Sequence, residues 1–438
     1  MWSYTERASR EYLSTGTRFP REILWAMGIV KAAAAHANYE AGLLSREKFL
    51  AIREEALALA EGRYDSLVTV DVYQTGSGTG LNLNVNEVIA SKALENHGVR
   101  VHPLDDVNMS QSSNDVVPTA IRLASARVAR EVGERLTLLY ESLRAKEEEF
   151  SGLVKPGRTH LRDALPVTLG QELSGYSDAF LHDSKLLSEA VDYVLEVPLG
   201  GTAVGTGANA PEGYRDAAIR ALRKLSGLPV RPGITFRGMK LLSDLAYLSS
   251  AYKIVALELW RLGQDIRLMY SGPFTGIAEI DIGTGAPGSS IMPGKKNPVT
   301  IESIMQASAT VKAYDETVVT GLLMGELELS MAIPLTGYAV VNAGKLLVEA
   351  LEAMATKVLP RIRPRPERMK ELAVRSAAIL TVLSPRLGYD RVARIAERLQ
   401  SGASLEEALG AEGISIEEVE DLIRESIEKI RGKRGPGS

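Results

Sequence analysis

A sustained helical periodicity between Met239 and Tyr270 constrains the fold of this chain more than any other feature. Apolar residues recur there at alternating steps of four and three, at Leu241, Leu245, Leu248, Tyr252, Val255, Leu259, Leu262, Ile266 and Met269. Such a heptad seam is typical of an α-helix that packs against other helices. Because Ala246, Leu257 and Trp260 are also apolar but lie outside the seam, we expect this helix to bury more than one face inside a bundle.

Comparable patterns predict long helices over residues 118–150, 167–194, 298–323 and 336–358. Pro118 and Pro298 suit a first helical turn, where the missing N–H costs no hydrogen bond. Helices of this length extend about 35–50 Å. Since strand signals are few, we predict a mainly α fold with a central bundle of long helices. Apolar surface on several sides of such helices favours association, so we expect a homo-oligomer.

Length and composition set further limits. The chain has 438 residues, for which we expect an N-terminal, mostly helical domain over 1–109, the central bundle over 110–361 and a small helical domain over 362–438. The stretch RIRPRPERM marks the second boundary, and Ser415 and Glu418 form a capping-box pattern before the last helix.

The charge balance and the residue types exclude several functions. A net charge of -4, with 51 basic and 55 acidic residues, leaves no electrostatic footprint for nucleic acid. No apolar run approaches the roughly 18 residues that cross a membrane, and the N-terminal residues contain no apolar signal core, so we expect a cytoplasmic protein without a membrane partner. With no cysteine and five histidines, we expect no metal site, and ordinary side chains must carry the chemistry.

Two polar loops lie before helical segments in the first part of the chain. The loop QTGSGTGLNLNVNE holds Ser77 and Thr79 among glycines, which permit positive φ, so that N–H groups and hydroxyls can converge on an anion. The loop VNMSQSSNDVVPT places Ser112, Ser113 and Asn114 just before a long helix. Helix N-terminal capping alone would explain one or two of these three, whereas the helix dipole would also favour a bound carboxylate.

A third polar segment, GRTHLRDALPVTLGQE, places Thr159 and His160 on a predicted loop that leads into a helix. An imidazole there could act as an acid or a base, although a structural histidine is the simpler alternative. The glycine-rich loop over 198–211 is assigned a structural role.

The fourth polar segment, GSSIMPGKKN, contains Ser289, Ser290, Lys295 and Asn297 directly before Pro298. Its glycines and its lack of hydrophobic periodicity predict a mobile loop, and a solvated surface turn is the alternative. The coincidence of four such segments beside long helices favours one shared site for a small dianion.

At these segments the sequence resembles the class II fumarase and aspartase superfamily, specifically the fumarases. GSSIMPGKKNP is similar to the superfamily signature Gly-Ser-Ser-x-Met-x-x-Lys-x-Asn. QTGSGTGLNLNVNEVIA, VHPLDDVNMSQSSND, GRTHLRDALPVTLGQE and GGTAVGTGANAPEGY resemble the other fumarase blocks in the same order. The resemblance covers nearly the whole chain. It implies a three-domain fold, a homotetramer with a twenty-helix core, and sites that each combine loops of three subunits.

The resemblance also implies a reaction, the reversible hydration of fumarate to L-malate through an aci-carboxylate, without metal or organic cofactor. Ser289 would be the catalytic base that removes the C3 proton of malate. His160, oriented by Glu302, would handle the departing hydroxyl through a bound water on the opposite face. The residues implied to hold the two carboxylates of fumarate or L-malate are Ser77, Thr79, Ser112, Ser113, Asn114, Thr159, Ser290, Lys295 and Asn297.

His102 and Asp105, in the segment HPLDD, match an accessory dicarboxylate site of the family. The chain departs from the family pattern at Leu104, where fumarases usually have Asn.

Two alternatives accompany this interpretation. Aspartate ammonia-lyases share the fold, but they tend to carry alanine where this chain has Ser77 and threonine where it has Ser113. A catalytically silent member, such as a lens crystallin, would have lost catalytic side chains, whereas Ser289, His160 and Glu302 are all present.

Overall fold

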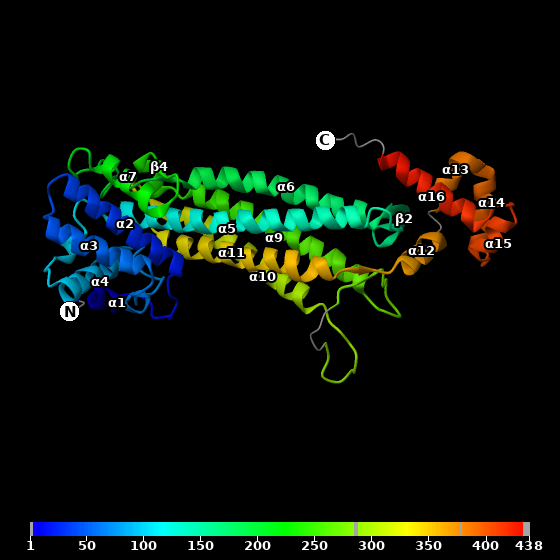
Figure 1. Cartoon of the computed structure of the whole chain (residues 1–438), viewed down its shortest axis with the longest axis horizontal. Helices are drawn as coiled ribbons and strands as arrows, with labels where there is room; N and C mark the ends of the chain where they lie inside the picture. Colours follow the sequence, from blue (N-terminus) through cyan, green and yellow to red (C-terminus); the bar gives the residue numbers. More distant parts are fainter. Residues whose placement is uncertain (1–2, 284–287, 377–378, 432–438) are drawn as a thin grey trace. The chain divides into compact units, whose positions relative to one another are not determined.

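The computed structural model describes residues 3–283, 288–376 and 379–431 and is mainly helical, which confirms the predicted fold class (Figure 1). Contacts between residues divide the chain into two compact units. The first contains Met1–Thr137, His182–Trp260 and Ile304–Leu351, and the second contains Leu138–Leu181, Arg261–Ser303 and Glu352–Ser438. The division into three domains at 1–109, 110–361 and 362–438 stays a prediction, and its last seven residues, 432–438, lie outside the described residues.

The α-helices, in chain order, are α1 (Ser3–Ser9), α2 (Arg21–Glu40), α3 (Arg46–Ala60), α4 (Thr79–His97), α5 (Ser113–Glu149), α6 (Leu169–Val194), α7 (Tyr214–Ser226), α8 (Thr235–Lys240), α9 (Ser243–Tyr270), α10 (Val299–Leu323), α11 (Ile333–Ala353), α12 (Pro366–Arg375), α13 (Ile379–Leu387), α14 (Tyr389–Gln400), α15 (Leu405–Gly410) and α16 (Ile416–Arg431). Helices α1 to α4, in blue, form one group in Figure 1, and α13 to α16, in orange and red, form another.

Short strands form two-stranded sheets. Antiparallel pairs are β1 (Val154–Thr159) with β2 (Arg162–Thr168), β5 (Ile280–Asp281) with β8 (Arg363–Pro364), and β6 (Gly325–Glu326) with β7 (Leu329–Ser330). The parallel pair is β3 (Glu196–Val197) with β4 (Arg231–Pro232).

The five predicted long helices are confirmed as α5, α6, α9, α10 and α11, but several ends differ. Helix α5 begins at Ser113, so Pro118 lies inside the helix and its predicted place in the first turn was wrong. The reason is a local cap: the Ser112 hydroxyl accepts from the Asn114 N–H at 3.2 Å, and the Asp115 carboxylate accepts from the Ser112 N–H at 2.9 Å. This reciprocal capping starts the helix before the proline. Helix α11 ends at Ala353, followed by a π-helical turn over Met354–Val358.

The heptad seam forms a buried stripe along α9. Every seam residue from Leu245 to Met269 is buried, whereas Leu241 lies in the extended link between α8 and α9 and is 49% exposed. Leu257 and Trp260, outside the seam, remain 45% and 38% exposed. The single chain therefore buries the seam but leaves part of a second apolar face of α9 accessible.

Small residues let the long helices of the first unit pack closely. A Cβ atom on Gly337 of α11 would overlap Ile121 of α5, and one on Gly344 would overlap Val128 of α5 and lie against Tyr252 of α9. These glycines allow α11 to lie directly against its neighbours.

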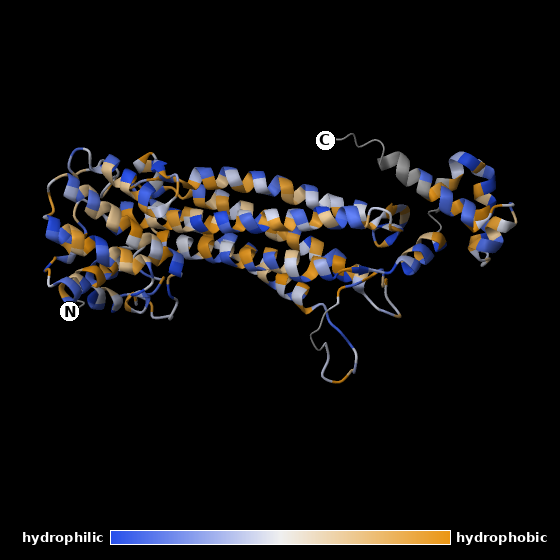
Figure 2. Ribbon diagram, viewed as in Figure 1, coloured by the Kyte–Doolittle hydropathy of each residue, from blue (hydrophilic) through white to orange (hydrophobic). Residues whose placement is uncertain are grey.

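Ion pairs add specific contacts between these helices. Arg122 of α5 lies 2.6 Å from Asp244 of α9, and both side chains are nearly inaccessible. Lys253 of α9 forms an ion pair with Asp315 of α10. Along the long helices polar residues interrupt the hydrophobic ones (Figure 2), and among the described residues no helix has an apolar stretch long enough to span a bilayer.

In the second unit the C-terminal helices enclose a small core. Leu383, Ile395, Leu409 and Val419 of α13 to α16 are its most buried large members. The predicted capping box before α16 is confirmed: the Glu418 N–H donates to the Ser415 hydroxyl at 3.2 Å, and the Ser415 N–H donates to the Glu418 carboxylate at 3.0 Å.

Candidate active site

The structure joins the first two predicted loops through a chain of hydroxyl groups in the first unit. Ser77 Oγ lies 2.9 Å from Thr79 Oγ1, and Thr79 Oγ1 lies 3.0 Å from Ser113 Oγ. Thr79 and Ser113 are the first residues of α4 and α5, so two helix N-termini meet at this hydroxyl cluster. Unpaired N–H groups and the helix dipoles make this a favourable place for a carboxylate.

Glycines permit the tight approach of the first loop. Gly78, the N-cap of α4, has φ 79°, a left-handed conformation that favours glycine. A Cβ on Gly76 would overlap the backbone of Met331. The loop can therefore place Ser77, which is buried, directly against the start of α4.

The second loop combines capping with contacts to the glycine-rich turn. Ser112 caps α5, as the simpler alternative predicted, but Ser113 directs its hydroxyl to Thr79 instead. The side-chain amide of Asn114 donates to the Ala203 carbonyl at 2.8 Å. Thus one of the three residues is explained by capping, and the other two face different partners.

Two buried charges hold the second loop, Lys31 from α2 and Asp115 from the loop itself, and sequence reasoning assigned neither a role. Lys31 of α2 donates to Asn108 and Gln111, at 3.1 and 2.9 Å. Burial lowers the pKa of the Lys31 ammonium to about 7, although the attraction of the Asp115 carboxylate raises it. Burial likewise raises the pKa of the Asp115 carboxyl to about 6, although backbone N–H donors lower it. A lone lysine in the apolar run IVKAAAAHAN was the available signal.

His160 lies at the tip of a β-hairpin, so the prediction of a plain loop that leads into a helix was wrong. Thr159 pairs with Arg162, and His160 and Leu161 form the turn with φ 55° and 57°. Two left-handed residues match the type I′ turn that suits a hairpin. Leucine adopts this conformation only at a cost of about 1–2 kcal/mol. His160 and Thr159 are both exposed.

Buried ion pairs hold the base of this hairpin. Lys155 of β1 lies 2.8 Å from Glu172 and 3.2 Å from Glu279, and Arg158 lies 2.8 Å from Glu279. Lys155 and Glu279 are buried. The network therefore fixes the strand that presents Thr159 and His160 in the second unit.

The fourth loop closes on itself. The Gly288 N–H donates to the Lys295 carbonyl at 3.1 Å, and the Asn297 side-chain amide donates to the Gly288 carbonyl at 2.6 Å. Inside this ring the Ser289 hydroxyl oxygen accepts hydrogen bonds from the backbone N–H groups of Ile291 and Met292, at 3.2 and 3.0 Å. Two N–H donors on one hydroxyl oxygen would stabilise negative charge there.

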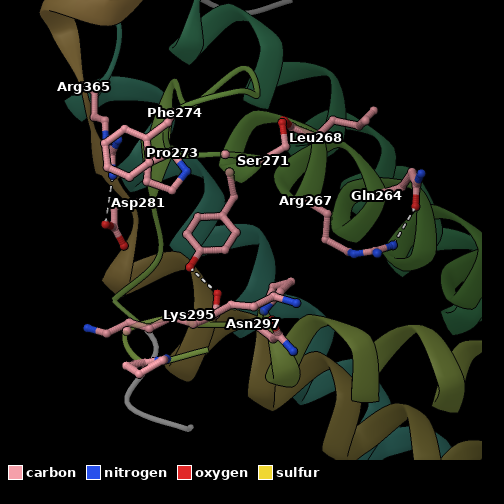
Figure 3. Close-up of a pocket in the computed structure, with 16 residues that line it drawn as sticks. Gln264, Arg267, Leu268, Ser271, Pro273, Phe274, Asp281, Lys295, Asn297 and Arg365 are labelled. Atoms are coloured by element: carbon pink, nitrogen blue, oxygen red, sulfur yellow. Dashed lines mark hydrogen bonds and ion pairs between the residues drawn. The ribbon is translucent and has the colours of Figure 1, made fainter. Parts of the chain in front are cut away.

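The loop borders a pocket of about 700 Å³. Lys295 and Asn297 line one part of it, and Arg365 and Phe274 line another (Figure 3). Arg365 forms an ion pair with Asp281 at 3.3 Å. The charged residues of the lining, Arg267, Asp281, Lys295, Lys296 and Arg365, give it an excess of positive charge that suits an anion.

The remaining predicted residues have separate surroundings. Ser290 is exposed on the fourth loop, and Glu302 lies half-buried in the first turn of α10. Across the described part of the chain, no hydrogen bond or ion pair links Glu302 to His160. The orientation of His160 by Glu302 therefore stays a prediction.

At the predicted accessory site, His102 Nδ1 lies 3.3 and 3.1 Å from the Leu104 and Asp105 N–H groups and caps a π-helical turn over Pro103–Val107. The same nitrogen lies 3.1 Å from the Asp105 carboxylate. This arrangement gives His102 a structural role, and the accessory dicarboxylate site itself stays a prediction.

Comparisons with known proteins place the chain among lyases. Residues 2–312 match the family model described as Lyase. The class II fumarate hydratase of Saccharolobus solfataricus is 46% identical over 423 residues, which cover 96% of this chain and 97% of that protein. The class II fumarate hydratase of Ralstonia nicotianae is 39% identical, with 97% of this chain and 94% of that protein covered.

Solved structures agree with the sequence relatives. The recombinant class II fumarase from Schistosoma mansoni has a TM-score of 0.90 and 30% identity, and the match covers 96% of this chain and 93% of that one. The fumarate lyase:delta crystallin from Brucella melitensis bound to cobalt has a TM-score of 0.90 and 36% identity, with 96% and 94% covered.

Proposed function

The chain belongs to the class II fumarate hydratases, a group of the lyase family, and from this premise we propose how its residues catalyse the reversible hydration of fumarate to L-malate. In the direction of elimination, Ser289 takes the proton from C3 of malate. The electron pair of that C–H bond moves into the neighbouring carboxylate and forms an aci-carboxylate. The bond between C2 and the hydroxyl then breaks. The hydroxyl takes up a proton on the face of the substrate where His160 acts, and it leaves as water.

The hydrogen bonds to Ser289 are the observation that carries this assignment. A serine hydroxyl is a weak base unless its alkoxide is stabilised. The N–H groups of Ile291 and Met292 already lie within 3.2 Å of the Ser289 oxygen, and Lys295 lies on the same loop. Preorganised donors of this kind stabilise the serine alkoxide, and so increase the fraction of Ser289 that is deprotonated and able to take the proton.

The two carboxylates of the substrate need several donors. We assign them to two groups of residues. The loops at the starts of α4 and α5 supply Ser77, Thr79, Ser112, Ser113 and Asn114. The second unit supplies Thr159, Ser290, Lys295 and Asn297. The hydrogen-bonded hydroxyl cluster supports the first assignment, because its groups converge at two helix N-termini.

An assembly of several copies is part of the proposal. We infer a homotetramer in which loops of three subunits combine into one site. Ile254, Leu257 and Trp260 of α9 are 38%, 45% and 38% exposed, although they lie in the middle of a long helix. Apolar side chains at helical spacing on one face favour burial against another helix. His102 and Asp105 are proposed to bind a dicarboxylate outside the main site.

A spectrophotometric assay tests the reaction and separates it from the aspartate ammonia-lyase alternative. L-Malate and L-aspartate are offered separately, and fumarate is followed by its ultraviolet absorbance. Fumarate is expected from malate and not from aspartate, because Ser77 and Ser113 follow the fumarase pattern. Ammonia release from aspartate without turnover of malate would overturn the proposal. A chain that is inactive on both would favour the catalytically silent alternative.

A further inference from the structure

A single buried cation lies within the apolar part of α2. The side chain of Lys31 is 0% exposed, and Ala32, Ala33, Ala34 and Ala35 follow it in the same helix. An ammonium that has lost its water must find other partners, since burying a charge costs several kcal/mol. Lys31 Nζ donates to Asn108 Oδ1 at 3.1 Å and to Gln111 Oε1 at 2.9 Å.

Asn108 connects this ammonium to the helix that starts at Thr79. Its Oδ1 also accepts from the side-chain amides of Asn82 and Asn86 of α4, at 2.9 and 3.2 Å. Its own amide donates to the Gln111 carbonyl at 3.2 Å. The amide oxygen of Asn108 therefore connects Lys31 and the loop before α5 to the first turns of α4.

Asp115 supplies the opposite charge and holds the other side of the second loop. Its side chain is 0% exposed. The carboxylate accepts from the Ser112 N–H at 2.9 Å and from the Gly200 and Thr202 N–H groups at 2.9 and 3.1 Å. The same turn receives the Asn114 amide at the Ala203 carbonyl. Asp115 thus fixes both the loop and the turn that contacts it.

We propose that Lys31 and Asp115 act together as positioning residues that hold the hydroxyl cluster in the arrangement that binds a substrate carboxylate. The inference rests on the proposed function. Neither residue is exposed to substrate, so both act through Asn108, Gln111, Ser112 and the 200–203 turn. The Lys31 ammonium also attracts the Asp115 carboxylate, and without this cation Asp115 would repel a dianion more strongly.

The test compares Lys31→Met and Asp115→Asn in the full-length chain with L-malate as substrate. Each change is expected to raise KM about tenfold, whereas kcat should fall less than about threefold because neither side chain contacts the reacting atoms. The double variant should have a KM close to that of either single variant, because the two residues act as one unit.

Lys253→Met is the matched control, since Lys253 pairs with the buried Asp315 between α9 and α10, and among the residues that the structure describes no hydrogen bond or ion pair joins it to the loops before α4 and α5. It is expected to lower Tm and leave KM unchanged. An equal rise of KM in this control would overturn the inference, because general loosening would then explain the effect. An unchanged KM in folded Lys31→Met would overturn it as well.

If Lys31→Met does not fold, Gln111→Met replaces it and removes one acceptor of the ammonium. A rise of KM of about threefold is expected, and an unchanged KM overturns the inference. Failure of the unmodified chain to form fumarate from malate would overturn the proposed function itself. If the unmodified chain is active and the variants have an unchanged KM, only the positioning role of Lys31 and Asp115 would be overturned.

Discussion

The hydroxyl of Tyr270 donates a hydrogen bond of 2.9 Å to the backbone carbonyl of Lys296 and so ties the end of α9 to the base of the Ser289 loop. Tyr270→Phe removes this hydroxyl and keeps the ring. A hydrogen bond of this kind contributes about 0.5–1.5 kcal/mol, so we expect kcat for malate to fall up to about tenfold without loss of folding. Tyr247→Phe is the matched control, because Tyr247 donates to Glu189 on the helix surface. Equal effects of the two changes would contradict a role specific to the loop.

The assigned acid and base are tested by Ser289→Ala and His160→Asn. Each is expected to lower kcat by orders of magnitude, because each removes a group that is proposed to transfer a proton. Asparagine tolerates the left-handed conformation of position 160, so His160→Asn should keep the hairpin turn. Turnover is measured with malate, and size-exclusion chromatography checks that the assembly is intact. Unchanged turnover in either variant would refute the role assigned to that residue.

Leu161 has a left-handed backbone conformation, so we expect its replacement by glycine to stabilise the protein. Leu161→Gly removes about 1–2 kcal/mol of backbone strain and costs about 0.5–1 kcal/mol of chain entropy. We therefore expect a net stabilisation, seen as a slightly higher Tm. Leu165→Gly is the control: Leu165 is also exposed but lies in β2, where glycine should only destabilise. A lower Tm for Leu161→Gly would show that its side chain makes stabilising contacts in the assembly.

The raised pKa of Asp183 in α6 leads us to expect that the stability of the protein depends on pH. Burial and then the neighbouring Glu258 carboxyl raise the pKa of Asp183 to about 7. Its folded-state pKa lies above its unfolded value, so the stability that comes from the bound proton is lost as the pH rises towards 7. Asp183→Asn should therefore raise Tm near pH 8 and change it little near pH 4, well below the folded pKa.

Calorimetry of the wild type and of Asp183→Asn at both pH values measures this difference. Asp216→Asn, the same change at an exposed position of α7, should not reproduce it. A Tm difference that does not grow with pH would contradict the role of the carboxyl pair.

Long helices were predictable because their period is repeated over many turns. The seam of α9 and the extent of α10 follow from apolar spacing alone. The hairpin that carries His160 was missed because Pro156, Gly157 and Pro166 are unfavourable in strands, and the register shifts between Pro156 and Gly157. The start of α5 depended on the reciprocal contacts of Ser112 and Asp115, which override the usual preference of Pro118.

The candidate site shows a similar contrast. The hydroxyls at Ser77, Thr79 and Ser113 could be found from their motifs, but their mutual contacts depend on how α4 and α5 meet. The place of Lys31 could not be derived, because a lysine in an apolar helix gives no sign of which loop it supports. Side chains that act from the interior leave a weaker sequence signal than those of glycine-rich loops.

The closed ring from Gly288 to Asn297 has a consequence for how this enzyme can change. A Cβ on Gly288 would overlap the Lys295 carbonyl oxygen, so the proposed base and the proposed cation share one compact scaffold. A displacement of the whole ring would therefore move the backbones of Ser289 and Lys295 together. We therefore expect adaptation to a new substrate to be easier at the hydroxyl cluster, whose members come from two separate segments of the chain, than within this ring.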